Sequence, residues 1–498
     1  MSTGAIALLV TLITAGVFSL LGLLHASRQT MNIEEFMVSR NRFGTGMSLA
    51  TIVASAMGVW ILFSPPQVGA TSGIAGIIGY CIGSAMPLVL FTQVGPRIRH
   101  LMPKGHSLNE FVLYRFGNAM YVLTLGIIVF YMFIYLAAEL TAIAKAVQIL
   151  ADVPLGWTAL LVITATFIYT TYGGLGASIF TDAIQFAVML PLLLISFGVA
   201  LAALGGWGNA FAPVQIQAPQ LLDLGYGDGI KFGVTLMIAI VAAEMFNQSN
   251  WQRIYACRND QAVQRSFLGG ALAVLPIILI SGGLGLLAAH FGFNDDRAFF
   301  SLLKQLALPL WFTLVVLVLA LALVMSTISA LLNGIASVFT IDLMRLFPQM
   351  QSSGLLRASR VLTVAIGIPA ILIAAQGYDV LYLFLLADLV CAGAFFPVLY
   401  GFYSRRLTGT AALVSALLGI AAGALFFPKP DFSAWLNIPW GGDLLVSFAL
   451  AWVVSMVVAI AASLTSQKSF DFQKLRMQSH SYLNLEEGLE EETVGIVK

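Results

Sequence analysis

The sequence has little charge and little cysteine. Only 9% of its 498 residues are charged, whereas soluble domains carry about 25%. Its 24 Lys and Arg nearly balance 23 Asp and Glu, so no charge excess indicates nucleic acid as a partner. Three cysteines, Cys81, Cys257 and Cys391, match no metal motif, and their odd number indicates no disulfide framework. This composition excludes a soluble enzyme, a disordered chain and a secreted disulfide scaffold.

Apolar residues make up 59% of the chain and occur in long runs. Because about 20 apolar residues cross a bilayer as a helix, we predict an all-α polytopic membrane protein with about thirteen spans. The first run has no basic residue before it and is longer than a signal-peptide core, so we expect it to be retained. The spans are expected at 4–26, 47–68, 74–95, 119–149, 156–172, 177–204, 229–249, 267–292, 309–341, 358–376, 379–403, 407–427 and 440–464.

Basic residues are divided unevenly between the two sets of alternate loops. One set holds 19 of the 24 Lys and Arg residues, including Arg28 and Lys498. The positive-inside rule places that set in the cytoplasm. It therefore predicts a multi-pass protein of the cell membrane, with the N-terminus outside and a flexible cytoplasmic tail. The set consists of segments 27–46, 96–118, 250–266, 342–360, 404–406 and 465–498.

Ionisable side chains inside a span are costly and need an explanation. Glu139 lies one helical turn after Tyr135, so the two share a face. Glu139 and Asp388 are expected either near a transported solute or in interhelical hydrogen bonds or ion pairs. Asp182 lies near the start of a span, where a helix N-terminus favours an anion. A structural role and a transport role both stay open for it.

Three polar residues, Glu244, Asn247 and Gln248, are spaced at i, i+3 and i+4 in one predicted span. On a continuous helix this spacing places them on one face. Three polar groups on one face need several partners or a water-filled cavity. We therefore expect them to line a solute cavity.

Two further stretches combine small or hydroxyl-bearing residues. The run Ala54–Gly58, with Trp60 just beyond it, favours unwinding of a helix, which exposes backbone carbonyls. Ser326, Thr327 and Ser329 interrupt a long aliphatic run. Carbonyls of a broken helix and two adjacent hydroxyls together suit a hard cation such as sodium. The alternative is that these hydroxyls bond to their own or a neighbouring helix.

Several motifs, taken in order along the chain, are similar to those of one transporter family. They are Phe36-Met37-Val38-Ser39-Arg40; Ala54-Ser55-Ala56-Met57 with Trp60; Leu108-Asn109-Glu110-Phe111 with Arg115-Phe116-Gly117; Tyr172-Gly173-Gly174-Leu175 with Thr181-Asp182 and Gln185; Gln248 with Trp251-Gln252-Arg253; and Ala322-Leu323-Val324-Met325-Ser326-Thr327. With these motifs placed on thirteen spans, the sequence resembles the sodium:solute symporter family.

The resemblance implies the leucine-transporter architecture of two inverted five-helix repeats. The repeats would be residues 47–204 and 229–403, joined by an external loop at 205–228. Residues 1–46 would add a first helix with its cytoplasmic loop, residues 404–464 two further spans, and residues 465–498 the tail.

The resemblance also implies roles for single residues. Sodium would bind to the backbone carbonyls of Ala54, Met57 and Leu323 and to the hydroxyls of Ser326 and Thr327. Asp182 is expected to act in gating or ion release. The residues expected at the solute cavity are Trp60, Tyr135, Glu139, Glu244, Asn247 and Gln248.

These observations predict a secondary active transporter that couples inward sodium movement to uptake of a small polar organic solute by alternating access. We expect no catalysis and no cofactor, with sodium, the solute and lipid as the partners. Proton coupling through Glu139 or Glu244 is the main alternative. A channel is a weaker one, because the polar residues form one localised cluster instead of rings along a pore. A non-transporting sensor is weaker as well, because it would need an output domain.

Overall fold

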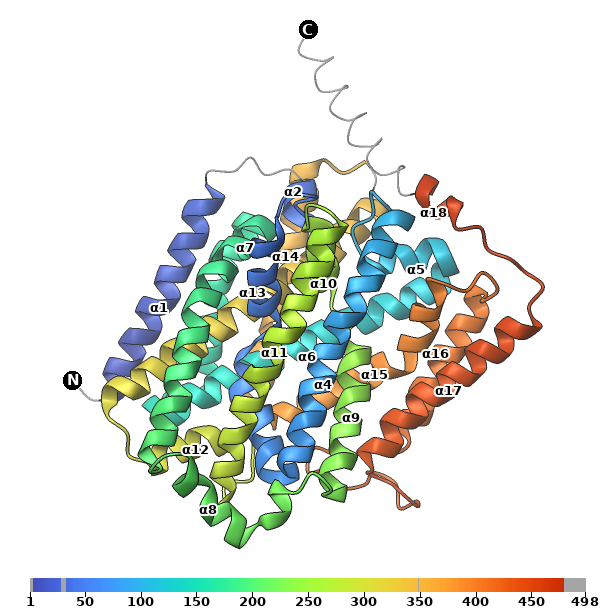
Figure 1. Cartoon of the computed structure of the whole chain (residues 1–498). Coiled ribbons are helices and arrows are strands. Elements are labelled where there is room, and N and C mark those ends of the chain that lie inside the picture. The colour runs from blue at the N-terminus through green and yellow to red at the C-terminus, as the bar shows by residue number, and fades with distance from the viewer. Residues whose placement is uncertain (1–2, 28–32, 348, 479–498) are drawn as a thin grey trace.

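The computed structural model describes residues 3–27, 33–347 and 349–478, and these residues form helices and no strand (Figure 1). The predicted all-α class is confirmed. Arg28, Lys498 and residues 479–498 of the predicted tail lie outside the described residues. The helices are α1 (Thr3–Ala26), α2 (Ile33–Met37), α3 (Thr45–Ala56), η1 (Val59–Leu62), α4 (Ser64–Leu101), α5 (Leu108–Phe116), α6 (Asn118–Ala151), α7 (Leu155–Ala203), α8 (Trp207–Gln217), η2 (Pro219–Leu222), α9 (Gly227–Glu244), α10 (Gln248–Ala256), α11 (Asp260–Ala289), α12 (Ala298–Gln305), α13 (Leu310–Leu346), α14 (Ser352–Gln376), α15 (Val380–Gly401), α16 (Gly409–Ala424), α17 (Leu444–Thr465) and α18 (Gln473–Gln478).

Within the described ranges, nine helices are long and apolar enough to cross a membrane, or ten if the bent pair α9–α10 counts as one span. The number thirteen stays a prediction. It requires the broken segment from α3 through η1 to the start of α4 to count as one span, α7 to contain two spans, and the shorter α16 to cross as well. At about 1.5 Å per residue, the 49 residues of α7 would extend roughly 73 Å, more than twice the hydrocarbon thickness.

Both long helices are interrupted by a glycine in a non-helical conformation, Gly73 in α4 and Gly174 in α7. Gly174 has a φ of 55°, a backbone angle that residues other than glycine rarely adopt. A Cβ there would also lie 2.8 Å from the Phe36 ring. These glycines fall between predicted spans, in the gaps 69–73 and 173–176. The chain therefore changes direction at both predicted boundaries.

Polar side chains fix where several helices begin. Ser107, Asn259, Asp379, Thr408 and Asp443 each precede a helix and accept a hydrogen bond from a backbone N–H of its first turn. Such caps satisfy donors that the helix itself leaves unpaired. In a chain with so little charge, they define helix starts that a run of apolar residues leaves undefined.

Two helices are broken in mid-course. The first ends at Ala56, inside the small-residue run, and the chain continues through η1 into α4. The second break lies between α9 and α10, which meet at 58°. This break corrects the prediction that Glu244, Asn247 and Gln248 share one helix face. Helical spacing does not continue across residues 245–247, where Asn247 instead caps the start of α10.

The helix α13 forms the centre of the bundle. In its most apolar stretch 83% of the residues are buried, against 28% for α14 and for α17. The outer helices expose large apolar side chains, such as Leu12 of α1, Leu372 of α14 and Val457 of α17. Exposed apolar surface of this extent marks a membrane or an interaction surface, and these helices are long enough to span. The chain is thus a polytopic membrane protein.

The basic segments gather at the end of the bundle that carries α2, α5 and α18 (Figure 1). Arg40 donates to the carbonyls of Pro103 and Gly105, which joins segments 27–46 and 96–118. Arg99 donates to the carbonyl of Cys257, in segment 250–266, and Arg115 to that of Ser404, in segment 404–406. Hydrogen bonds thus bring together segments that the positive-inside rule assigns to one side. Which side of the membrane this is stays a prediction.

Candidate functional site

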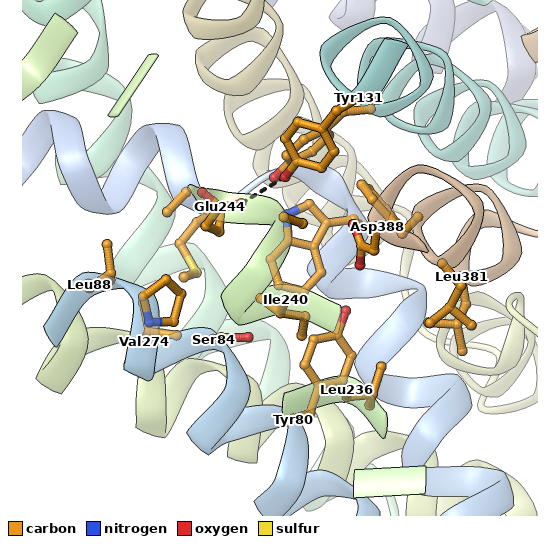
Figure 2. A pocket seen from close by; sticks show the side chains of 18 residues that line it. Tyr80, Ser84, Leu88, Tyr131, Leu236, Ile240, Glu244, Val274, Leu381 and Asp388 are labelled. Atoms are coloured by element: carbon orange, nitrogen blue, oxygen red, sulfur yellow. Dashed lines mark hydrogen bonds between the residues drawn. The ribbon is translucent and has the colours of Figure 1, made fainter. Parts of the chain in front are cut away.

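A buried cavity lies beside the break at Ala56, between both broken helices (Figure 2). Its volume is about 60 Å³. The wall is mostly apolar and aromatic, with two carboxylates. The lining residues are Ala56, Met57, Trp60, Tyr80, Ser84, Pro87, Leu88, Tyr131, Tyr135, Leu236, Ile240, Ala243, Glu244, Val274, Leu381, Phe384, Leu385 and Asp388. A concave, mostly apolar space with a few convergent polar groups is the usual form of a small-molecule site.

Three of the residues predicted at the cavity, Trp60, Tyr135 and Glu244, do line it. Glu244 is the last residue of α9, so its carboxylate lies where that helix breaks. It accepts hydrogen bonds from the Tyr131 hydroxyl at 3.1 Å and from the Asn250 amide at 2.7 Å. Figure 2 shows Tyr131, Glu244, Asp388 and Tyr80 around the same space.

Asn247 and Gln248 do not belong to the cavity lining. The Asn247 amide donates to Glu244 at 3.2 Å, while its oxygen accepts from the backbone N–H and hydroxyl of Ser249. Gln248 points elsewhere and donates to the backbone carbonyl of His106 at 2.9 Å. The break between α9 and α10 explains both placements, because Asn247 caps the start of α10 next to Glu244 and Gln248 lies in the first turn of α10 and points away.

Glu139 is also outside the cavity lining, although its hydrogen-bond partner Trp60 belongs to that lining. Its fully buried carboxylate accepts hydrogen bonds from the backbone N–H groups of Val59, at 2.9 Å, and Trp60, at 3.4 Å. These are the donors that η1 leaves unpaired at its start. Glu139 therefore acts as a cap supplied by α6 for the broken helix, which is one form of the interhelical alternative considered above.

A Gly58→Ala substitution is expected to disturb this cap. A Cβ at residue 58 would lie 2.2 Å from the Glu139 carboxylate, which would have to move away from the N–H groups of Val59 and Trp60. Leaving buried donors unpaired costs about 1–3 kcal/mol. The expected result is a lower thermal unfolding midpoint of the purified protein. The matched control is Gly126→Ala, where nothing lies within 4 Å; equal midpoints for the two variants would contradict the cap.

A second buried cluster surrounds Asp182, on α7 beyond the Gly174 turn. Its carboxylate accepts from Arg253 of α10 at 2.9 Å, Thr51 of α3 at 2.6 Å and Ser326 of α13 at 2.7 Å. Asp182 is fully buried and Arg253 nearly so. The sequence analysis placed Asp182 at a helix start and did not pair it with Arg253. One carboxylate instead joins four helices.

The residues predicted to hold sodium lie next to this cluster. Thr327 donates to the backbone carbonyl of Ser55, at 3.3 Å, in the last turn of α3. Met57 and Leu323 line the same small cavity, although they are far apart in sequence. Ser326 is bonded to Asp182. The end of α3 and the middle of α13 therefore face each other, with carbonyls on one helix and hydroxyls on the other.

A polar network closes the end of the bundle that carries α2 and α5. Buried His106 lies 2.7 Å from Glu34 and 3.5 Å from Glu110. Burial alone would lower the pKa of His106, but hydrogen bonds to Glu110 and Glu34 raise it to about 9. Burial would raise the pKa of Glu34, whereas bonds to His106 and Arg40 lower it to about 2. The ion pairs of this network are thus formed at neutral pH.

Comparison with known proteins gives concordant results. The sodium:solute symporter family matches residues 36–419. A spermidine transporter of Candida albicans, DUR31, is 28% identical over 81% of this chain and 78% of its own. The sodium/proline symporter of Escherichia coli is 25% identical over 89% and 92% of the two chains. The structure of a Na+-coupled sialic acid symporter superposes with a TM-score of 0.76 at 18% identity, covering 94% and 99%. The fold is that of the leucine-transporter group, as the sequence analysis predicted.

Proposed function

We propose, from the premise that this chain belongs to the sodium:solute symporter family, that sodium bound between α3 and α13 drives uptake of a small polar organic solute through the cavity beside it. Family membership makes the chain a sodium-coupled secondary transporter of small solutes and not an enzyme. In this proposal the chemistry is binding and alternating access, so no bond is made or broken and no cofactor takes part.

The proposed sodium ligands are the carbonyls of Ala54, Met57 and Leu323 and the hydroxyls of Ser326 and Thr327. Their support is the break of α3 at Ala56, which frees carbonyls from helical hydrogen bonds, and the bond from Thr327 to Ser55 across the interface. Oxygen atoms are the ligands that hard cations prefer. No thiol or imidazole is needed in this set.

The single observation that carries the proposal is the position of Met57. This residue lines the solute cavity, together with Ala56, and also the small cavity that it shares with Leu323. A sodium ion that orders the backbone at Met57 would therefore also order one wall of the solute cavity. Because sodium and the solute would both contact this stretch of backbone, the binding of one would change the affinity for the other, as coupling requires.

Asp182 is proposed to govern sodium release. Ser326 is both a proposed ligand and a donor to Asp182, so a change in the Asp182 bonds changes the sodium site. Arg253 and Thr51 hold the same carboxylate. Movement of α10, which carries Arg253, would thus alter the sodium site through two hydrogen bonds, from Arg253 to Asp182 and from Ser326 to Asp182.

Alternating access is proposed to move the two predicted repeats, 47–204 and 229–403, against each other. Each repeat begins with a broken helix, α3–η1–α4 in the first and α9–α10 in the second. The network of His106 and Glu34 would separate when that end opens. Because that end also gathers the basic segments, we propose that it is cytoplasmic and that the N-terminus is outside.

The proposal is tested first by sodium binding, which needs no knowledge of the solute. Purified protein titrated with NaCl against KCl, at constant ionic strength, should unfold at higher temperature as sodium rises. At a hundred times the dissociation constant, the stabilisation amounts to about 2.7 kcal/mol. Equal effects of the two salts would contradict a sodium site.

Transport itself is tested in proteoliposomes with a labelled panel of solutes. An inward sodium gradient at constant pH should drive accumulation, whereas a pH gradient without sodium should not. A membrane potential of 100 mV adds about 2.3 kcal/mol per charge, or about fortyfold accumulation. Accumulation driven by the pH gradient alone would favour proton coupling, with Glu139 and Glu244 as the first residues to neutralise.

The names of the relatives do not select one solute. Spermidine, proline and sialic acid, which those names mention, carry positive, balanced and negative charge respectively. The choice among them depends on the cavity of this chain.

A further inference from the structure

Two carboxylates in the wall of the solute cavity have no positively charged partner within the described residues. Glu244 receives hydrogen bonds from Tyr131, Asn247 and Asn250, all of them neutral. Asp388, in the middle of α15, makes no hydrogen bond or ion pair with any described residue, yet it lines the same space. A charged group removed from water without a partner is strongly destabilised.

The nearby buried cations are already engaged. Lys145 lies 2.5 Å from Asp296, and Arg253 lies 2.9 Å from Asp182. Lys145 also donates to the carbonyl of Tyr378. Neither cation lines the cavity. No cation among the described residues therefore balances Glu244 and Asp388, and a cationic solute would supply the missing charge.

Five aromatic residues of the wall form a connected series of rings. Successive ring centroids are between 4.9 and 6.2 Å apart. The rings follow one another in the order Tyr80, Trp60, Phe384, Tyr135 and Tyr131. Aromatic faces attract cations, and they also pack against the alkyl part of an organic cation. The last ring donates its hydroxyl to Glu244, so the series ends at a carboxylate.

From these observations we propose that the solute is an organic cation, an aliphatic amine bound as its ammonium ion by Glu244 and Asp388 within the aromatic wall. This rests on the proposed function, because it assigns the solute of the same cavity. The hydroxyl of Ser84, which lines the cavity and has no hydrogen-bond partner in the described part of the chain, adds an acceptor for an N–H group.

The same geometry disfavours anions and zwitterions. The start of a broken helix is a common site for a solute carboxylate, because its N–H groups are free and its dipole is positive there. In this chain the N–H groups of Val59 and Trp60 are already bonded to Glu139. Among the described residues, no Lys, Arg or His lines the cavity. A solute carboxylate would meet two like charges and no cation.

The volume limits the size of the solute. A water molecule occupies about 10–15 Å³ of cavity volume, so about 60 Å³ holds a handful of non-hydrogen atoms. This suits a short amine, such as a four-carbon diamine. A longer polyamine would require the cavity to widen as the repeats move.

The test measures binding to the whole purified protein by calorimetry and thermal stability, in buffer containing sodium. The probes are butylamine, putrescine and spermidine, against proline, galactose and urea. At least one amine should bind and raise the unfolding temperature, and the other three should not. Glu244→Gln and Asp388→Asn should each weaken amine binding at least fivefold. The control Asp228→Asn changes an exposed acid at the start of α9, the same helix, and should leave binding unchanged.

Sodium titrations of the same variants separate this proposal from the proposed function. Both cavity variants should keep the sodium-dependent stabilisation, which also shows that they are folded. Normal sodium stabilisation without binding of any amine at 10 mM, or with amine affinity unchanged in both variants, would overturn the amine proposal alone. Loss of the sodium effect in the unmodified protein would overturn the proposed function instead.

Discussion

An Arg253→Met variant is expected to lose about 3–5 kcal/mol of unfolding free energy and to reach the membrane in much smaller amounts. The guanidinium is buried and donates to Asp182, to Thr51 at 3.0 Å and to the carbonyl of Ser249 at 3.0 Å. Methionine fills much of the volume but supplies no charge. The Asp182 carboxylate would then be buried with hydroxyl partners only. Thermal and denaturant unfolding of the purified variant measure the loss.

The double variant Asp182→Asn with Arg253→Met separates pairing from packing. If the unpaired carboxylate causes the loss, removing its charge should restore part of the stability, because neither charge is then left alone. Arg42→Met is the matched control, since Arg42 pairs with Glu35 at the surface. Exposed pairs of this kind contribute about 0–1 kcal/mol. Equal losses of unfolding free energy in Arg253→Met and Arg42→Met would contradict a stabilising role of the buried pair.

The fold was largely predictable because its main determinants are local. Long apolar runs define most of the helices, and the run Ala54–Gly58 marks where α3 ends. The turns at Gly73 and Gly174 fall in predicted gaps between spans. A helix cap or a glycine with positive φ leaves a trace within a few residues of sequence. Which helices pack against each other in the folded bundle cannot be predicted from such local signals.

The site was predictable only in part, because its contacts join residues far apart in sequence. Glu139 was recognised as an unusual carboxylate, but its partners lie about 80 residues earlier, at the start of η1. Tyr131 was missed, although it precedes Tyr135 by four residues and the same spacing argument would have found it. Tyr80 offers no such signal, since it lies in a long uncharged run. Arg253 was noted only as part of a motif.

The error at Asn247 and Gln248 has a different cause. The spacing argument assumed one continuous helix, and the chain leaves the helix immediately after Glu244. Breaks of this kind occur where a transporter exposes backbone to its ligands, so the helical spacing rule fails at the position where the proposed solute cavity lies. The same reasoning applied to α3 succeeded because small residues marked that break. The stretch Met245–Asn247 contains none.

The proposed sodium site yields the second large effect. Thr327→Ala should raise the half-saturating sodium concentration about tenfold or more, which corresponds to about 1.4 kcal/mol of binding energy per factor of ten. The variant removes one proposed ligand oxygen from a residue that is 1% exposed. Within the described part of the chain its hydroxyl bonds only to the carbonyl of Ser55, at 3.3 Å, so the loss in stability without sodium should be small. Sodium titrations of the unfolding temperature, balanced with KCl, measure both quantities.

Three further variants show whether the oxygen itself binds the ion. Thr327→Ser keeps the hydroxyl and should stay close to the unmodified protein, whereas Ser326→Ala should weaken sodium binding and also remove a donor to Asp182. Thr340→Ala is the control on the same helix, because the Thr340 hydroxyl bonds to Ala336 and Ser359, away from the break in α3. It should lower stability equally with and without sodium. Unchanged sodium dependence in both Thr327→Ala and Ser326→Ala would mean that these hydroxyls serve only helix packing, and the ion would then have to bind elsewhere along the broken helices.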